Sequence, residues 1–160
     1  MIRPFRAEDA ASIAEIYNYY VLHTTTSFET IAVSAEQMRD RLTAFSREAP
    51  VLVAEEDGAI VGYCYAHPWK ERAAYSHTYE TTVYLTQEVL GKGYGRMLME
   101  RLIKGCRQLD IRVLIACITA ENTASCKFHE QLGFRKVSEF HQVGRKFDKW
   151  LDVVDYELIL

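Results

Sequence analysis

The sequence predicts a single domain of mixed α/β (α+β) class that spans residues 1–160. Segments with the three-to-four-residue apolar spacing of helices alternate with short runs typical of strands, in the order βααβββαβαββ. A length of 160 residues suits one domain, and no repeat, linker or low-complexity tract divides the chain.

The first fifty residues are expected to form one strand and two helices. Residues 2–6 have the pattern of a strand. The apolar spacing over residues 10–21 predicts a helix with Glu8 and Asp9 in its first turn, where the helix dipole favours carboxylates. The run Ser34-Ala35-Glu36-Gln37 has the form of a capping box and predicts a second helix that ends before Pro50.

The same patterns predict the rest of the elements. Residues 51–55 and 60–66 flank the turn signal Asp57-Gly58 and predict a β-hairpin. A strand over residues 78–85 leads through a glycine-rich turn into a helix with an apolar face from Tyr94 to Leu109. A strand is expected at 113–118, a helix at 122–132 that stops at Gly133, and terminal strands at 137–142 and 151–158.

Charge and cysteine usage argue against several classes of function. The balance of 19 Lys+Arg against 22 Asp+Glu gives no basic surface for nucleic acid or an anionic membrane. No apolar run is long enough to span a bilayer, and the first residues lack a signal-peptide core, so we expect a cytoplasmic protein. The four cysteines and five histidines are dispersed without metal-ligand spacing, and no metal is expected.

Three alternating glycines between a predicted strand and a predicted helix indicate a phosphate-binding turn. In the run Leu90-Gly91-Lys92-Gly93-Tyr94-Gly95-Arg96, glycines let backbone N–H groups approach an anion, and the helix adds the positive end of its dipole. Gly95 is followed by Arg96-Met97, so the run is no Walker loop. Arg96 also stands where a dinucleotide fingerprint needs glycine. The alternative to a phosphate-binding turn is a glycine-rich β-to-α connection without a ligand.

The run is similar to the pyrophosphate turn of the GNAT acyltransferases, Gln/Arg-x-x-Gly-x-Gly/Ala after an apolar strand. Val83-Tyr84-Leu85 and Gly93-Tyr94-Gly95 fit this pattern, whereas Leu90 stands at the usual Gln/Arg position. Stretches such as Tyr79-Glu80-Thr81-Thr82 and His129-Glu130-Gln131-Leu132-Gly133 resemble the phosphinothricin and methionine sulfone/sulfoximine acetyltransferases. The resemblance implies the GNAT fold, with a central mixed, mostly antiparallel sheet flanked by helices.

The resemblance further implies acetyl-CoA as co-substrate, a small primary amine of the amino-acid type as acceptor, and a homodimer. Acetyl-CoA is expected to contact the end of one strand, the glycine turn, and the start of a later helix. The residues are Val83, Tyr84, Leu85, Gly91, Lys92, Gly93, Tyr94, Gly95, Arg96, Asn122 and Ser125.

Two residues are candidates for proton transfer. An α-amino group has a pKa of about 8 and must lose a proton before it attacks a thioester, so a base is needed. Glu80 is the candidate base, with an ordinary ion pair as the alternative, and His129 is the candidate acid at the leaving thiolate, with a packed, non-titrating histidine as the alternative. A backbone N–H in the strand 83–85 is expected to stabilise the tetrahedral intermediate.

The acceptor pocket is expected to be lined by two loops and the strand of Glu80. Lys70 and Arg72 are candidates for holding a carboxylate, with an exposed basic loop as the alternative. The acceptor-binding candidates are Phe28, Glu29, Lys70, Glu71, Arg72, Glu80, Thr81 and Thr82.

These residues favour an N-acetyltransferase that acts on a small amino acid or analogue by direct transfer in a ternary complex. One alternative is a protein or peptide N-acetyltransferase, against which Lys70 and Arg72 argue. The other is a catalytically silent acyl-CoA-binding sensor, against which the presence of both Glu80 and His129 argues.

Overall fold

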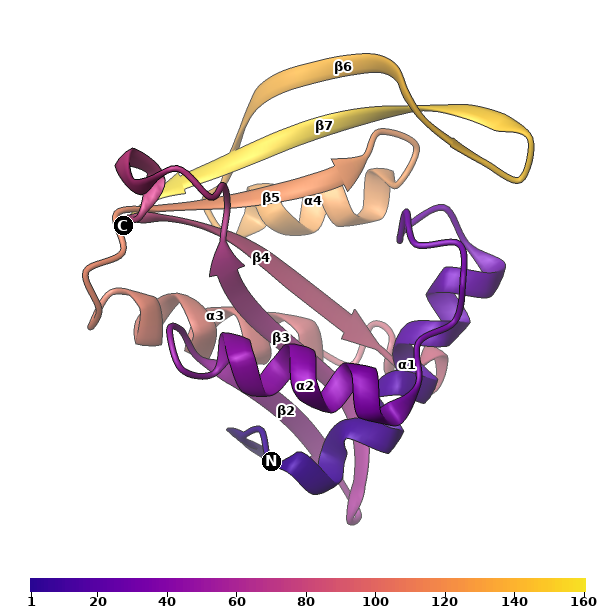
Figure 1. Ribbon diagram of the computed structural model, residues 1–160, viewed down its shortest axis with the longest axis vertical. Coiled ribbons are helices and arrows are strands. Elements are labelled where there is room, and N and C mark those ends of the chain that lie inside the picture. Colours follow the sequence, from indigo (N-terminus) through magenta and orange to yellow (C-terminus); the bar gives the residue numbers. More distant parts are fainter.

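The computed structural model describes residues 1–160, which form one seven-stranded sheet covered by helices on both faces (Figure 1). The elements are β1 (Ile2–Pro4), α1 (Ala10–His23), α2 (Ala35–Phe45), β2 (Val51–Glu56), β3 (Ala59–Pro68), β4 (Thr78–Leu85), α3 (Tyr94–Cys106), β5 (Val113–Thr119), α4 (Thr123–Gln131), β6 (Arg135–Lys146) and β7 (Lys149–Ile159). This order confirms the predicted βααβββαβαββ. None of the helices is long and apolar enough to cross a membrane.

The sheet has the strand order β1-β2-β3-β4-β5-β7-β6. Every neighbouring pair is antiparallel except β4 and β5, which are parallel, so the predicted mixed, mostly antiparallel sheet is confirmed. The parallel pair is short, because only Thr78–Glu80 of β4 pairs with Val113–Ile115 of β5. Beyond Glu80 the two strands diverge, and this divergence opens the middle of the sheet.

Alternating side chains of the central strands belong to two separate hydrophobic cores, one on each face of the sheet. Val51 and Val53 of β2 pack with α1 and α2, whereas Leu52 and Ala54 belong to the cluster that contains α3. This follows from the two-residue period of a strand, and it explains why β2 reads as a continuous apolar run.

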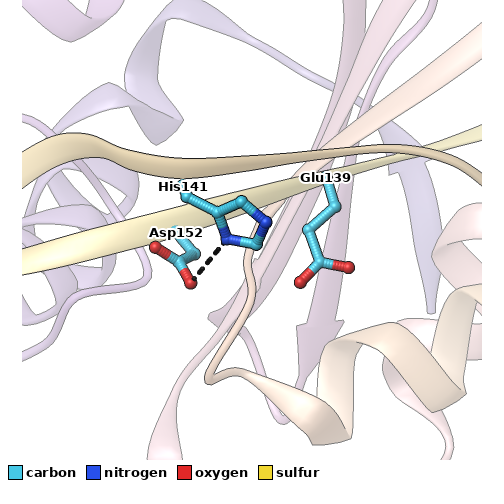
Figure 2. A group of neighbouring side chains, drawn as sticks. All are labelled: Glu139, His141 and Asp152. Carbon is cyan, nitrogen blue, oxygen red and sulfur yellow. Dashed lines mark hydrogen bonds and ion pairs between the residues drawn. The ribbon is translucent and has the colours of Figure 1, made fainter.

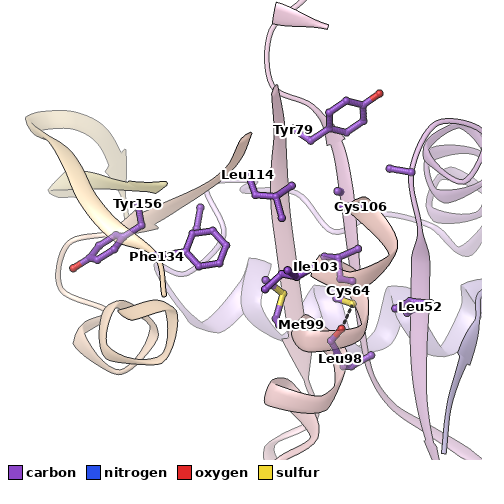
Figure 3. Packing of buried hydrophobic residues seen from close by; sticks show 14 of the residues in the cluster. Leu52, Cys64, Tyr79, Leu98, Met99, Ile103, Cys106, Leu114, Phe134 and Tyr156 are labelled. Carbon is purple, nitrogen blue, oxygen red and sulfur yellow. Dashed lines mark hydrogen bonds between the residues drawn. The ribbon is translucent and has the colours of Figure 1, made fainter. Parts of the chain in front are cut away.

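The larger cluster fills the space between α3 and the sheet (Figure 3). Leu98 and Ile103 of α3 lie against Leu52 and Cys64 of the sheet, and the Cys64 thiol donates to the Leu98 carbonyl at 3.5 Å. The smaller cluster joins α1 and α2 to a row of tyrosines that includes Tyr63 and Tyr65. These two cores hold the opened strand β4 from both sides.

Several local signals form as predicted. Ser34 and Gln37 exchange the two hydrogen bonds of a capping box, at 3.1 and 2.8 Å. Asp57 and Gly58 both have positive φ, as a tight hairpin turn between β2 and β3 requires. Gly133 adopts φ +91° in the position that follows Leu132, the C-cap of α4.

Other boundaries differ from the prediction. Strand β1 ends at Pro4 rather than residue 6, and Glu8 and Asp9 lie in a separate 3-10 turn (Ala7–Asp9). There the Asp9 carboxylate receives two 2.8 Å hydrogen bonds from the Arg3 guanidinium, so its role is an ion pair rather than a helix dipole partner. Helix α3 stops at Cys106, which leaves Leu109 45% exposed beyond the helix.

The last two strands form a long hairpin that the sequence pattern partly hides. Phe147 and Asp148, both with positive φ, form its two-residue turn. Register shifts in β6 break the two-residue alternation, so only residues 137–142 of this strand were predicted.

Glu139, His141 and Asp152 form a polar cluster (Figure 2). It lies at the second register shift of β6, between Phe140 and Gly144. Asp152 of β7 accepts from the Gln142 N–H at 2.8 Å and lies 3.3 Å from Nδ1 of His141. Ligand atoms of Glu139, His141 and Asp152 lie within 4.8 Å of one another, a convergence that sequence spacing did not indicate. Since Glu139 also pairs with Lys136, this cluster is satisfied by its own contacts.

Candidate active site

A cavity of about 510 Å³ lies where β4 and β5 diverge. Its walls come from α1, the loop after α1, the end of β3, both diverging strands, α4 and β7. The lining residues are Tyr17, Thr26, Ser27, Phe28, Glu29, Tyr65, His67, Glu80, Thr81, Thr82, Val83, Tyr84, Ala116, Cys117, Ile118, Thr119, Asn122, Ser125, His129 and Val153.

The structure brings together ten of the residues predicted from sequence. Both proton-transfer candidates line the cavity, together with members of the predicted donor and acceptor sets: Phe28, Glu29, Glu80, Thr81, Thr82, Val83, Tyr84, Asn122, Ser125 and His129. Leu85 and the run from Gly91 to Arg96 lie outside its lining, as do Lys70, Glu71 and Arg72.

Glu80 is the free carboxylate of this cavity. It occupies the last position at which β4 pairs with β5, opposite Ile115. Burial, and to a lesser degree the charge of Asp155, raises the pKa of Glu80 above its ordinary value, and no hydrogen bond or ion pair counteracts this. A carboxylate of raised pKa that faces a cavity has the properties of a general base.

The carboxylate of Glu29, by contrast, already has a cationic partner. The Arg41 guanidinium of α2 binds both of its carboxylate oxygens, at 3.1 and 2.6 Å. Although burial raises the pKa of Glu29, the hydrogen bonds from Arg41 and Tyr17 outweigh it and leave the pKa lowered. Glu29 therefore stays ionised and paired, and it shapes the wall of the cavity.

His129 is almost completely buried, with 4% of its surface exposed. Its Nδ1 lies 2.9 Å from the carbonyl oxygen of Ser125 one helical turn earlier. A carbonyl only accepts, so Nδ1 carries the hydrogen and Nε2 keeps a free lone pair. Burial lowers the pKa of His129, which favours the neutral ring.

The start of α4 is fixed by Asn122, whose side-chain oxygen accepts from the Ser125 N–H at 3.2 Å. Its amide nitrogen lies 3.4 Å from the Thr26 hydroxyl, so the cap also touches the loop that closes the cavity. Asn122 and Ser125, the predicted acetyl-CoA contacts on this helix, thus line the cavity, with His129 one turn further along.

The loop that carries Phe28 is tied down by groups distant in sequence. Lys146, at the end of β6, donates to the Ser27 carbonyl at 2.6 Å, and the Tyr17 hydroxyl lies 2.8 Å from that of Ser27. Lys146 is 5% exposed and has no carboxylate partner, and burial lowers its pKa. A Cβ at Gly144 would overlap the Phe28 ring, so the hairpin backbone closely approaches this loop.

Sequence reasoning missed the other ten lining residues, among them the titratable groups Tyr65, His67 and Cys117. Tyr65 and His67 continue the alternating β3 pattern, which can be seen in sequence, but only pairing with β4 brings them into the site. Burial, with the charges of Glu80 and Asp155, raises the pKa of the Cys117 thiol to about 12, so it is no thiolate nucleophile at neutral pH.

The glycine turn has the backbone that an anion site requires. Gly91 and Gly93 adopt φ +78° and +88°, and an added Cβ would meet nothing within 4 Å at either position. Gly93 is the N-cap of α3 and supplies no side-chain cap, so the first N–H groups of the helix are free for an anion.

Gly95 does not play the part that the sequence predicts for it, which is to leave room for an anion by lacking a side chain. Its φ is not positive, and a Cβ there would make van der Waals contact with Leu85 and Phe128 rather than fill an open cradle. At this position the backbone N–H near the start of α3, rather than the missing side chain, is what an anion would meet.

The basic loop after β3 is engaged with its own aromatic residues. The Lys70 ammonium lies 4.0 Å from the centre of the Trp69 ring and 5.3 Å from that of Tyr75. Lys70, Glu71 and Arg72 are exposed, and they belong to the connection between the strands of His67 and Glu80.

The family model of the acetyltransferase (GNAT) domain matches residues 2–154. This chain belongs to the GNAT acetyltransferase family. The L-amino acid N-acyltransferase MnaT of Escherichia coli (strain K12) is 39% identical to this GNAT domain, over 99% of the chain and 93% of that protein.

Relatives of the predicted branch are also similar to this GNAT domain. The L-methionine sulfoximine/L-methionine sulfone acetyltransferase of Salmonella typhimurium is 37% identical over 95% of the chain and 90% of that protein. The phosphinothricin acetyltransferase of Sinorhizobium meliloti, solved in complex with AcCoA, superposes with a TM-score of 0.97 at 33% identity, over 100% of this chain and 88% of that one. The predicted family, branch and fold are thereby confirmed, and the protein is an N-acetyltransferase.

Proposed function

We propose that this N-acetyltransferase transfers the acetyl group of acetyl-CoA to the primary amine of a small amino acid or amino-acid analogue. The observation that carries the proposal is the Glu80 carboxylate, which faces the cavity without a partner and has a raised pKa. The relatives named above, which act on L-amino acids, methionine sulfoximine or sulfone, and phosphinothricin, support the acceptor class.

The residues present fit acetyl-CoA. Its pyrophosphate suits the open cradle at Gly91 and Gly93 and the uncapped start of α3. From Thr81 to Leu85, β4 has no pairing partner on its β5 side. Apart from the Leu85 carbonyl, which accepts from the Tyr20 hydroxyl at 2.6 Å, its outward backbone groups are available to the amides of the pantetheine arm. One of these N–H groups, in Val83–Leu85, would stabilise the oxyanion.

The transfer requires two proton movements. Glu80 takes one proton from the acceptor ammonium, the amine nitrogen then attacks the thioester carbon, and the carbon–sulfur bond breaks. The attacking nitrogen loses a second proton, and the departing thiolate gains one. The free Nε2 of His129 can receive a proton and pass it to sulfur, as its fixed tautomer allows.

The cavity suits the amine end of the acceptor better than its carboxylate. No Lys or Arg side chain lines it, and its one unpaired carboxylate attracts an ammonium group. We retain Lys70, Glu71 and Arg72 as proposed acceptor contacts through movement of their exposed loop toward the neighbouring ends of β3 and β4.

The same lack of a lining cation favours a second candidate, acetylation of the N-terminal amine of a peptide, which presents no carboxylate next to the reacting nitrogen. A silent acyl-CoA sensor is disfavoured, because such a protein has no use for an unpartnered carboxylate of raised pKa in its cavity.

We also propose a homodimer in the cytoplasm. The outer hairpin exposes Phe140, Val143, Phe147 and Trp150, each at least 48% exposed, which is unusual for an isolated surface. All four cysteines are unpaired thiols, in keeping with a reducing compartment. Sedimentation equilibrium of the wild type and of Phe147→Lys tests the dimer.

A thiol-release assay with acetyl-CoA tests the function. L-methionine, L-methionine sulfone, L-phosphinothricin, a polyamine and a short peptide would serve as acceptors, with mass spectrometry of the product. We expect turnover to be fastest with a free amino acid or its analogue. Fastest turnover with the peptide would favour the second candidate, and binding of CoA without turnover would favour the sensor.

A further inference from the structure

The register of β3 and β4 places a hydrogen-bond acceptor, the His67 ring, beside the proposed catalytic carboxylate of Glu80. His67 and Glu80 are direct cross-strand partners. Side chains at such positions leave the same face of the sheet with Cβ atoms roughly 4.5–5.5 Å apart. Both residues line the cavity, so the imidazole and the carboxylate border the same space.

The His67 ring is held with one nitrogen free. Its Nδ1 lies 3.0 Å from the Pro68 carbonyl oxygen, which only accepts, so Nδ1 carries the hydrogen and Nε2 keeps its lone pair. The ring stacks on Phe45 of α2 with centres 5.0 Å apart and planes 20° from parallel. The ring of Tyr65, two residues earlier on β3 and on the same face, has its centre 5.8 Å from the centre of the His67 ring.

The surroundings keep this ring neutral. Burial lowers the pKa of His67, the carbonyl of Pro68 partly opposes this, and the positive charge of Arg41 on α2 lowers it further. Arg41 is itself bound by Glu29, and from β4 the facing group is Glu80. At neutral pH the ring is therefore an acceptor at Nε2.

We propose that Nε2 of His67 binds the one N–H of the acceptor amine that is retained in the product amide. A primary ammonium has three N–H bonds: one proton passes to Glu80 before attack, a second leaves the nitrogen as the tetrahedral intermediate collapses, and the third stays in the amide. His67 gains no proton in this cycle. It orients the nitrogen so that its lone pair faces the thioester carbon.

This assignment makes His67 a determinant of selectivity for primary over secondary amines. In an N-methyl acceptor, both N–H protons must leave, so the methyl group takes the place of the retained hydrogen and meets Nε2. The hydrogen bond is then lost even in the wild-type enzyme. The inference rests on the proposed function, because it requires an amine acceptor in this cavity.

The test compares two substitutions on two acceptors. His67→Phe keeps an aromatic ring to stack on Phe45 but removes the acceptor atom, and His67→Gln keeps a side-chain oxygen that accepts. With L-methionine sulfone, we expect His67→Phe to lower kcat/KM about tenfold, with the KM for acetyl-CoA unchanged, and His67→Gln to recover part of the loss. With N-methyl-L-methionine sulfone, already poor for the wild type, His67→Phe should change kcat/KM by less than about twofold.

An equal factor of loss on both acceptors would reduce His67 to a packing residue, and no loss on the primary amine would exclude the contact. If the wild type acetylates no amine, the proposed function fails, and ¹⁵N NMR of the His67 ring then decides the inference separately. An Nδ1–H tautomer whose Nε2 resonance shifts on addition of L-methionine sulfone supports it. An Nε2–H tautomer, or a resonance that does not respond, overturns it.

Discussion

The glycine turn takes its residues from one run of the chain, Gly91 to Gly95, whereas the cavity of Glu80 is lined by side chains from segments between Tyr17 and Val153. The turn depends on backbone conformations that each residue adopts locally, such as φ +88° at Gly93. The cavity depends on contacts across the fold, such as Lys146 with Ser27. Substitutions in the glycine turn should therefore change the KM for acetyl-CoA, whereas substitutions around the cavity should change the KM or kcat for the acceptor.

The sharpest effect is expected on the acceptor side, from Glu80→Gln. We expect kcat to fall by about 10² or more at neutral pH, because the proposed base for the acceptor amine is lost. The loss should shrink as pH rises and the amine deprotonates unaided. A pH–rate profile that keeps the wild-type acidic limb and magnitude would rule out Glu80 as the base.

Asp155→Asn gives a graded control for the same carboxylate. The charge of Asp155 contributes, after burial, to the raised pKa of Glu80. Its removal should lower that pKa, so the acidic limb of kcat/KM should move to lower pH. A limb that moves upward, or stays in place, would mean that it reports another group.

On the donor side, Gly93→Val should raise the KM for acetyl-CoA by more than about tenfold, since a β-branched residue resists φ +88° and its side chain would occupy the cradle. Gly58→Val is the matched control for backbone strain, because Gly58 has φ +81° with equally open surroundings but belongs to the neighbouring β2–β3 turn, whose Glu56 accepts from the Tyr94 hydroxyl, and not to the glycine run itself. Both variants should lose similar stability in a urea titration. If the two variants had equal KM values for acetyl-CoA, the glycine turn at Gly93 would have no specific role in donor binding.

Lys146→Met tests whether long-range contacts position the acceptor loop. The substitution leaves the Ser27 carbonyl without its donor, and we expect unfolding free energy to fall by about 1–3 kcal/mol. The KM of the acceptor should rise severalfold while that of acetyl-CoA stays constant. Lys149→Met, in the same hairpin but 59% exposed at its side chain, should change neither quantity measurably.

The smallest effect is expected from Arg72→Ala, because the exposed Arg72 lies outside the cavity lining. Because we propose that Arg72 contacts the acceptor carboxylate only after its loop moves, activity on L-methionine should fall about threefold, whereas activity on the decarboxylated analogue should change by less than about twofold. Equal factors for the two acceptors would show that the loop does not hold the carboxylate.

Local signals predicted much of the fold. The capping box at Ser34, the Asp57-Gly58 turn and the Gly133 stop each act within a few residues, so sequence patterns suffice for them. The full length of β6 was missed because register shifts interrupt its alternation, and the role of Asp9 was missed because its partner, Arg3, lies outside the helix. Of the cavity residues, Glu80 and His129 were predicted from motifs of the family, whereas no motif pointed to His67.

The sequence by itself determined the order of the elements, the glycine turn proposed to bind the donor and the candidate base, because backbone propensity, glycine conformation and short motifs act over a few residues. Only the tertiary structure decided how far β4 and β5 stay paired, which carboxylate remains free, and which nitrogen of each cavity histidine carries hydrogen. In the sequence, nothing about Glu29 and Glu80 themselves shows which of the two carboxylates is free. They differ because Arg41 reaches one of them and nothing reaches the other, and such contacts depend on how distant segments pack.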